Sequence, residues 1–344
     1  MEIGVSNVAR ASAGPHNEQP ESPTVSAVVC AFTEKRWSLL EKAISSLDSQ
    51  TTPPLETIVC VDHNDELLRK CDEHFGAHRP VGAVPLVVLA NKYSGRLGAA
   101  RNTAIEFASG DVVAFMDDDA AAAPEWVERL AAAYDDERIA AVGGRPLPVF
   151  EGARPRWFPY EFDWVIGCVY RGLPLSRGPS VRLIGANMSA RRAVLEEIGG
   201  FHSDHQDDMD MCHRVAHAGY LVIYEPLAVN YHFVPVGRTT WEYFWKKCYH
   251  ANLGKVEVFA NMADAASLSA ELAFVRRALT TGFVTEMGQV IRGDLYGLAR
   301  FGAMIAGIGM AGVGHAWGKL QLRWSRRPDN GRADLTTGNR RGRP

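Results

Sequence analysis

Short apolar runs alternate with amphipathic stretches from residue 25 onwards, and this pattern predicts an α/β fold with a mainly parallel sheet flanked by helices. Runs rich in Val and Ile predict strands over residues 25–31, 56–62, 85–90, 111–116 and 139–143. Apolar side chains at helical spacing predict helices over residues 37–47, 97–108 and 125–134, the last one opened by Pro124. This order of strands and helices is Rossmann-like.

The second half of the chain is less regular. Residues 145–179 are rich in Pro, Gly, Arg and aromatic residues, so we expect a long, partly irregular loop on the substrate side. Further elements are expected as a strand at 181–184, helices at 191–198 and 207–218, and two short strands at 221–225 and 228–232. Beyond Pro235 only helical patterns occur, at 239–252, 267–281 and 283–316, which predict a C-terminal α-helical appendage packed on the α/β domain.

These patterns divide the chain into four parts. Residues 1–23 are polar and lack the apolar core of a secretory signal, so we expect a disordered segment and a protein that is not exported. Residues 24–235 form the α/β domain, and residues 236–320 form the helical region. Residues 321–344 show no periodicity and are expected to be a basic, disordered tail.

Composition excludes several classes of protein. With 344 residues, 47% of them hydrophobic, the chain can bury a sizeable core and is not disordered as a whole. A net charge of −3 gives no overall basic surface, so nucleic acid is not an expected partner. The six cysteines contain no CxxC pair, which argues against a disulfide scaffold or a thiolate zinc site and favours the reducing cytoplasm.

One stretch of the helical region suggests contact with a membrane. Residues 301–317 contain no Asp, Glu, Lys or Arg, but they are rich in Gly and Ala and fall short of the about 20 apolar residues of a typical span. A packed helix, a helix at the membrane surface and a full span all fit this composition. From Lys319 to the C-terminus there are eight basic and two acidic residues, which would attract an anionic membrane or form a solvated tail.

Two acidic clusters are candidates for chemistry. Asp117, Asp118 and Asp119 directly follow a predicted buried strand, at the sheet edge where open α/β folds bind their ligands. Such closely packed carboxylates suit Mg²⁺ or Mn²⁺ held together with substrate phosphates, although a solvated loop or a helix cap would also use them. Asp207 and Asp208 begin a predicted helix, and either of them, facing a cleft, could act as a general base.

Five motifs, in this order, resemble those of a family 2 nucleotide-sugar glycosyltransferase with the A-type glycosyltransferase (GT-A) fold. They are VSAVVCAFTE, VCVDHND, GRLGAARNTAIEFASGDVVAFMDDDAAAAPEW, IGANMSARRAVLEEIGGF and DDMDMCHRVAHAGY, and they cover about residues 25–232. The resemblance implies inverting, metal-dependent transfer of a sugar from a nucleoside-diphosphate donor to an acceptor hydroxyl. It also makes residues 24–120 the nucleotide-binding half of the domain and residues 121–235 the acceptor half.

The resemblance further implies roles for individual residues. Asp208 would be the catalytic base, and Asp117, Asp119 and His232 would hold the metal, although His232 would serve equally well as a core histidine. The expected nucleotide-binding residues are Phe32, Glu34, Asp62, Arg101, Asn102, Asp117 and Asp118. The residues expected to face the donor sugar and the acceptor are Gly185, Ala186, Asn187 and Asp207. Two positions depart from the family pattern, His63 where a second Asp is frequent and Asp207 where Glu is common.

Three alternatives differ from this assignment. A nucleotidyltransferase of similar fold is expected to carry a Gly-rich phosphate loop after the first strand, whereas AFTEKRWS has no glycine. A non-catalytic scaffold on the same fold would not need to keep Asp117, Asp119 and Asp208 together. A zinc or iron hydrolase would use His202, His205, His213 and His217, but the pair at 213 and 217 lacks the HExxH glutamate.

The expected partners follow from this assignment. They are a UDP-, GDP- or dTDP-linked sugar, an acceptor that is a saccharide, a lipid or a small molecule, and an anionic membrane surface. We expect the protein in the cytoplasm, in peripheral contact with the cytosolic face of the membrane. Its pathway would be the synthesis of a cell-envelope polysaccharide or a glycolipid.

Overall fold

The computed structural model describes residues 22–76, 79, 82–202, 206–260 and 265–325. Both ends expected to be disordered lie almost entirely outside these residues. At the C-terminal side, however, residues 321–325 belong to the last helix instead of to the tail.

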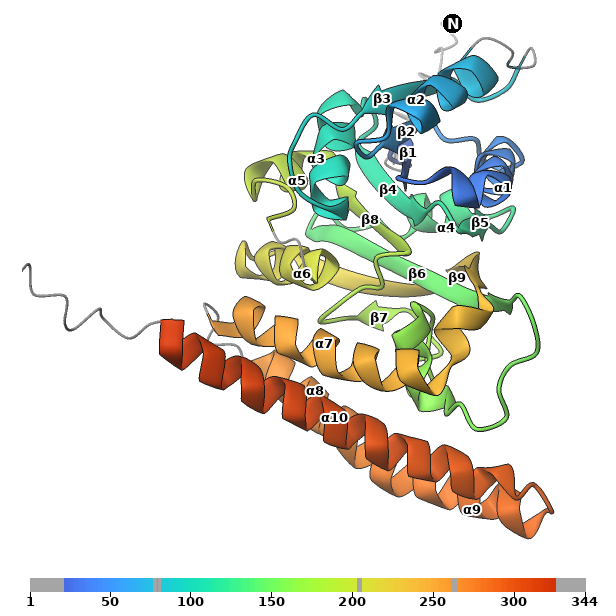
Figure 1. Cartoon of the computed structure of the whole chain (residues 1–344). Helices are drawn as coiled ribbons and strands as arrows, with labels where there is room; N and C mark the ends of the chain where they lie inside the picture. The colour runs from blue at the N-terminus through green and yellow to red at the C-terminus, as the bar shows by residue number, and fades with distance from the viewer. Residues whose placement is uncertain (1–21, 77–78, 80–81, 203–205, 261–264, 326–344) are drawn as a thin grey trace, which may run out of the picture.

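A single nine-stranded sheet forms the centre of the α/β domain (Figure 1). The strand order is β3-β2-β1-β4-β8-β6-β9-β5, and β7 pairs with β9 beside this path. The strands are β1 (Val25–Ala31), β2 (Glu56–Val61), β3 (Leu86–Ala90), β4 (Val112–Asp117), β5 (Ala120–Ala122), β6 (Ile139–Phe150), β7 (Gly178–Pro179), β8 (Asn187–Arg191) and β9 (Leu221–Val234). From β3 to β4 neighbouring strands are parallel, whereas β8 is antiparallel to both β4 and β6. The α/β class is confirmed, with a mixed rather than mainly parallel second half.

Helices cover both faces of the sheet. Their bounds are α1 (Trp37–Asp48), α2 (Asp65–Cys71), α3 (Leu97–Phe107), α4 (Trp126–Ala132), α5 (Arg192–Glu197) and α6 (Asp207–His217). Helices α1, α2 and α4 bury their apolar sides in one core cluster, and α3, α5 and α6 bury theirs in the other. Each face of the sheet therefore has its own core, as expected for strands that read as continuous apolar runs.

The C-terminal helices pack on the sheet domain as an additional layer (Figure 1). They are α7 (Trp241–Ala260), α8 (Ala265–Arg277), α9 (Phe283–Ile291) and α10 (Tyr296–Ser325). A third apolar cluster joins them to the 3-10 helix Tyr160–Ile166 through Phe158, Phe162, Phe244 and Met304. The predicted C-terminal helical appendage is confirmed.

Helix α10 contains most of the uncharged stretch at 301–317, and it packs closely against α7. A Cβ atom added at Gly314 would lie 2.2 Å from the carbonyl oxygen of Tyr249, so only glycine permits this approach. By length and composition, Tyr296–Trp324 could also cross a membrane; its most apolar window of 18 residues has a mean hydropathy of 1.3 and is 33% buried. Packing therefore accounts for one side of this helix only.

Several elements differ from the sequence-based expectation. Strand β6 continues to Phe150, into the expected loop, and the strand expected at 181–184 lies instead at β8. The two short strands around Pro226 are one strand, β9, in which residues 225–228 are unpaired with β6 and accommodate the proline. The single helix expected at 283–316 is broken between α9 and α10, where Gly293 adopts a φ of +96°.

Candidate active site

Two chain segments bring a metal-competent cluster together at the carboxyl end of β4. Asp117 ends β4, and Asp119 lies in the turn that leads into β5. Strand β5 pairs antiparallel with β9 so that Ala120 lies opposite His232. Asp117, Asp119 and His232 each offer one ligand atom, and these atoms all lie within 4.8 Å of one another. The structure thus assembles the three residues expected to bind the metal.

The chemistry of this cluster fits a divalent cation. Two carboxylates are suitable ligands for Mn²⁺ or Mg²⁺, and the imidazole is a ligand that a transition-metal ion such as Mn²⁺ accepts more readily than Mg²⁺ does. From the residues that the structure describes, the buried oxygen Oδ1 of Asp119 receives no hydrogen bond of good geometry, although His232 Nε2 lies 3.1 Å away. The other ring nitrogen, Nδ1 of His232, lies 3.4 Å from Cys168 Sγ, which orients Nε2 toward the carboxylates.

Two arginines that the sequence did not single out surround these acids. Arg36 lies 2.7 Å from Asp118 and 3.2 Å from Asp119, and Arg238 lies 3.2 Å from Asp119. Burial raises the pKa of Asp118 to about 6, even though Arg36 opposes this shift. Burial also acts to raise the pKa of Asp119, but His232, Arg238 and Arg36 lower it overall. The cluster is therefore a compensated patch of buried charge, not a solvated loop.

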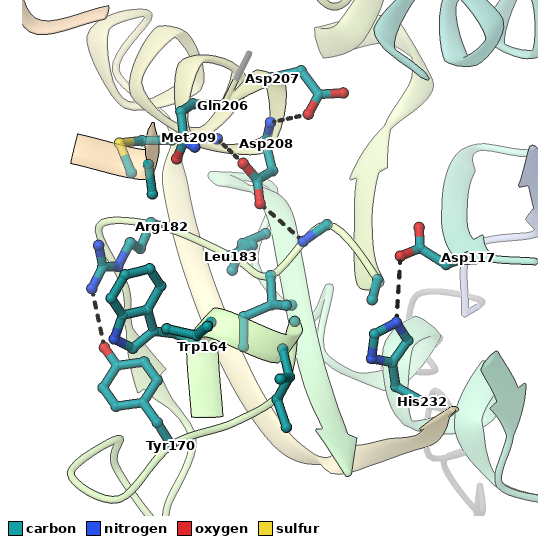
Figure 2. A pocket seen from close by; sticks show the side chains of 18 of the residues that line it. Asp117, Trp164, Tyr170, Arg182, Leu183, Gln206, Asp207, Asp208, Met209 and His232 are labelled. Carbon is teal, nitrogen blue, oxygen red and sulfur yellow. Dashed lines mark hydrogen bonds and ion pairs between the residues drawn. The ribbon is translucent and has the colours of Figure 1, made fainter. Parts of the chain in front are cut away.

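A cavity of about 440 Å³ extends from Asp117 and His232 to the second acidic pair (Figure 2). Asp208, in the first turn of α6, accepts the Gly185 N–H through Oδ2 at 3.0 Å and the Met209 N–H through Oδ1 at 2.8 Å. Burial and the neighbouring Asp207 raise the pKa of Asp208. This is the environment of a carboxylate that is poised to take up a proton.

Arg101 links the two acidic groups. Its guanidinium, buried on α3, donates to Asp207 at 2.8 Å and to the Gly185 carbonyl at 3.0 Å, and lies 3.8 Å from Asp117. Gly185 fits closely here, because a Cβ atom would lie 3.2 Å from Arg101 and 3.3 Å from Asp208. Arg101 therefore fixes the distance between the metal-competent end of the cavity and Asp208.

Of the residues expected at the nucleotide, Arg101 and Asp117 line the cavity, whereas Phe32, Glu34 and Asp62 lie at the same edge of the sheet but outside the lining. Strands β1 and β4 are parallel with Cys30 opposite Asp117, so Phe32 and Glu34 follow β1 at the edge where Asp117 ends β4. Phe32 is 54% exposed. Asp62, directly after β2, accepts a hydrogen bond from Asn91 at 2.7 Å.

Two asparagines have structural partners instead of facing the cavity. Asn102 holds the turn after Gly200 by exchanging two hydrogen bonds, of 2.9 and 2.8 Å, with the backbone of Phe201. Asn187 is fully buried, where it accepts from the Trp126 indole at 2.8 Å and donates to the Ala228 carbonyl at 3.0 Å. Neither lines the cavity, whereas Gly185 and Ala186 do. Both side chains thus have partners within the fold, and the roles expected for Asn102 at the nucleotide and for Asn187 at the sugar stay predictions.

The histidine-rich stretch does not form a metal site among the residues that the structure describes. The rings of His213 and His217 stack with their centroids 6.5 Å apart. Among the described residues, the cluster of three potential metal ligands consists of Asp117, Asp119 and His232, none of which belongs to this stretch. His205 lies outside the described residues.

The cavity also includes side chains that sequence reasoning missed. Trp164, Tyr170 and Arg182 come from the region around the expected loop. Helix α7 contributes four more lining residues, namely Tyr243, Lys247, Ala251 and Lys255. Their spacing of four residues, visible in the sequence, is typical of one helix face, but only the fold shows what this face contacts.

The chain is similar to known glycosyltransferases over about half of its length. The family model described as Glycosyl transferase family 2 matches residues 26–199, just over half of the chain. A glucosyl-dolichyl phosphate glucuronosyltransferase of Haloferax volcanii is 34% identical over 181 residues, which are 52% of this chain and 56% of that protein. A pre-mycofactocin glycosyltransferase of Mycobacterium tuberculosis is 29% identical over 182 residues, which are 51% of this chain and 37% of that protein. The match thus spans about half or less of the length of these relatives.

A solved structure extends the likeness through the helical region. The mannosyltransferase PcManGT from Pyrobaculum calidifontis, in complex with GDP-Man and Mn²⁺, has a TM-score of 0.53 and 19% sequence identity. The likeness covers 88% of this chain and 89% of that one. At this identity it shows a shared fold.

Proposed function

We propose that the chain, which belongs to glycosyl transferase family 2 and is a glycosyltransferase, transfers a sugar from a nucleoside diphosphate to an acceptor hydroxyl. The transfer would invert the configuration at the anomeric carbon. One observation carries this proposal. A single cavity has a cluster able to bind a divalent cation at one end and a buried carboxylate, Asp208, farther along, with Arg101 between them. Inverting transfer needs these two functions, a cation at the leaving group and one base at the acceptor.

We assign the metal to Asp117, Asp119 and His232. When bound there, Mg²⁺ or Mn²⁺ would neutralise the negative charge that develops on the diphosphate leaving group. Arg36 and Arg238 already offset the charge of Asp118 and Asp119, so these arginines hold the acids in place. The Mn²⁺ and GDP-Man bound by the similar mannosyltransferase support this choice of ion and donor class.

We assign the base role to Asp208. Both of its oxygens accept backbone N–H groups, which fixes the carboxylate in one orientation within the cavity. It would take the proton from the acceptor hydroxyl as that oxygen attacks the anomeric carbon. Arg101 acts as a positioning residue, because it binds Asp207 and the Gly185 carbonyl on either side of Asp208.

We assign the nucleotide to the surface formed by Phe32, Glu34 and Asp62. These residues follow β1 and β2 at the carboxyl edge of the parallel strands, where open α/β sheets bind ligands. The exposed ring of Phe32 offers a stacking face for a base.

We further propose peripheral contact with the cytosolic face of an anionic membrane. Around the α9–α10 turn, Ile291, Leu295 and Leu298 are 56–87% exposed. Neighbouring exposed apolar side chains are typical of an interaction surface. Basic residues of the C-terminal tail would add attraction to anionic lipids. The name of the Haloferax relative, which acts on a dolichyl phosphate-linked sugar, supports a lipid-linked acceptor.

The direct experiment measures nucleoside-diphosphate release from a panel of UDP-, GDP- and dTDP-sugars, with Mn²⁺, Mg²⁺ or EDTA and with saccharide and lipid acceptors. We expect one nucleotide class to bind in a metal-dependent way, as measured by calorimetry. Asp119→Asn should remove this dependence, whereas Asp111→Asn, at the far end of β4 and bonded to Thr24, should keep it. Failure of every nucleotide diphosphate to bind would refute the donor site.

A further inference from the structure

Three cations line the cavity without a part in the proposed transfer step. They are Arg182, after β7, and Lys247 and Lys255 on α7. In Figure 2, Arg182 lies with Trp164 and Tyr170 on the opposite side of Asp208 from the pair of Asp117 and His232. The cavity therefore has a second charged end, opposite in sign to the cluster around Asp117.

Helix α7 forms one wall of the cavity between these two ends. Tyr243, Lys247, Ala251 and Lys255 follow one another at every fourth position, so they share one face of the helix. Lys247 feels the charges of both Asp208 and Arg238. Two turns farther on, Lys255 donates to Glu271 on α8 at 2.7 Å. The wall thus places Lys247 nearer to the base and Lys255 deeper in the basic end.

Positive charge exceeds negative charge at this end. Glu271 accepts from Arg182 at 3.0 Å as well as from Lys255, so one carboxylate serves two cations. Lys247 has no carboxylate within ion-pair distance among the residues that the structure describes, whereas its neighbour Lys246 pairs with Glu242. Burial lowers the pKa of Lys255, whereas Lys247 is exposed to solvent where it lines the cavity. Such a site favours the entry of an anion.

We propose that this basic end binds an anionic group on the acceptor, a phosphate or phosphodiester, and that Lys247 is its principal contact. The proposal rests on the proposed function, since it takes Asp208 as the base that the acceptor hydroxyl faces. An ammonium and a guanidinium match the oxygens of a phosphoryl group by charge-assisted hydrogen bonds. The rings of Trp164 and Tyr170 line the same end and offer an apolar surface to the part of the acceptor that carries the phosphate.

Two sources can provide this anion, a lipid phosphate and a water-soluble sugar phosphate. Octyl phosphate represents the first source and glucose 1-phosphate the second, with octyl glucoside as the uncharged control. Each probe is titrated by calorimetry into the full chain loaded with Mn²⁺ and with UDP or GDP, whichever binds. The bound nucleotide keeps the probes away from the metal-competent end.

We expect at least one phosphate probe to bind and octyl glucoside not to bind. Lys247→Gln should weaken phosphate binding about tenfold or more, the effect of losing a charge-assisted hydrogen bond. Lys246→Gln, the next residue on the same helix but paired with Glu242 outside the cavity, should leave phosphate affinity unchanged. Tighter binding of octyl phosphate would identify a lipid source, and tighter binding of glucose 1-phosphate a soluble source.

Three results would overturn the proposal. The first is that octyl glucoside binds as tightly as the phosphates, and the second is that Lys247→Gln leaves the phosphate affinity unchanged. The third is that Lys247→Gln weakens nucleotide binding alone, which would assign this lysine to the donor end. A protein that binds phosphate through Lys247 but no nucleotide would instead keep the anion site and contradict the donor site, so the two failures are distinguishable.

Discussion

The substitution Asp208→Asn tests the assigned catalytic base independently of the metal-competent cluster. Asparagine keeps the size of the side chain but cannot take up the proton of the acceptor hydroxyl. General-base catalysis typically contributes about 10²–10⁴-fold to the rate, which corresponds to about 3–5 kcal/mol of transition-state free energy. We therefore expect kcat to fall by about 10²–10⁴-fold, while the Kd of the nucleotide stays within about twofold because Asp208 is not part of the metal-competent cluster.

The same substitution has two opposing effects on stability. Asp208 accepts N–H groups at both oxygens, and an amide can accept at only one of them, so one backbone donor loses its partner at about 1–3 kcal/mol. Against this, the raised pKa of Asp208 means that the fold prefers the protonated acid. Ionisation thus costs stability as the pH rises from the ordinary aspartate pKa through the raised value, and the variant avoids this cost. Its melting temperature relative to wild type should therefore be higher at about pH 7.5 than at about pH 4.

The assay is nucleoside-diphosphate release at saturating donor and acceptor, measured across pH. In the wild type the rate should rise as Asp208 loses its proton, with a midpoint above the ordinary aspartate pKa, and Asp208→Asn should lose this acid limb. Asp210→Asn is the matched control, because Asp210 lies on the same helix, pairs with Arg214 at 2.8 Å and does not line the cavity. An Asp208→Asn enzyme with kcat within about tenfold of wild type, or with the acid limb intact, would remove Asp208 from the base role.

Three further predictions test other parts of the molecule. Gly185→Ala should lower kcat with little change in nucleotide Kd, because its Cβ would lie 3.2 Å from Arg101 and 3.3 Å from Asp208; an unchanged kcat would contradict the close fit. Gly314→Ala should lower the free energy of unfolding by about 1–3 kcal/mol, because its Cβ would collide with the backbone of Tyr249. Gly312→Ala, with open space at its Cβ, should be neutral or stabilising by up to about 1 kcal/mol. Similar melting temperatures for the two variants would refute the tight packing of α10 on α7. Deletion of residues 326–344 should weaken flotation with vesicles rich in phosphatidylglycerol but not with pure phosphatidylcholine, and equal flotation with and without these residues would return the tail to a solvated role.

The parallel half of the sheet could be predicted closely from the sequence. Strands β1, β2 and β4 are buried on both faces, so each reads as an unbroken apolar run with a sharp polar end, and their expected bounds differ from the observed ones by at most one residue. Because these strands are parallel, Asp62 and Asp117 had to lie at one edge. In this region, the apolar pattern of each strand is therefore enough to predict where its polar end lies in the sheet.

The rest of the site depends on long-range pairing that no local pattern encodes. His232 contacts Asp119 only because β5 lies antiparallel to β9. Arg238 reaches Asp119 from the short helix that follows β9. The motif residues Asn102 and Asn187 show the opposite problem, since their side chains are used within the fold. A sequence motif marks where a polar group is needed, but the direction of its side chain is set by packing against distant segments.

Helix α10 shows why composition left several alternatives open for residues 301–317. In a helix that packs on a soluble core, large apolar residues usually face inward. Here Gly307, Gly314 and Gly318 face other parts of the protein at short distance, while Ile305, Val313 and Trp317 are 42–55% exposed. Large apolar residues of α10 therefore lie on both sides, since Met304 is fully buried in the third apolar cluster while Val313 is exposed. The packed-helix interpretation therefore accounts for the inner side of α10, which holds α7 and thus one wall of the cavity in position, whereas membrane contact of the outer side stays a prediction.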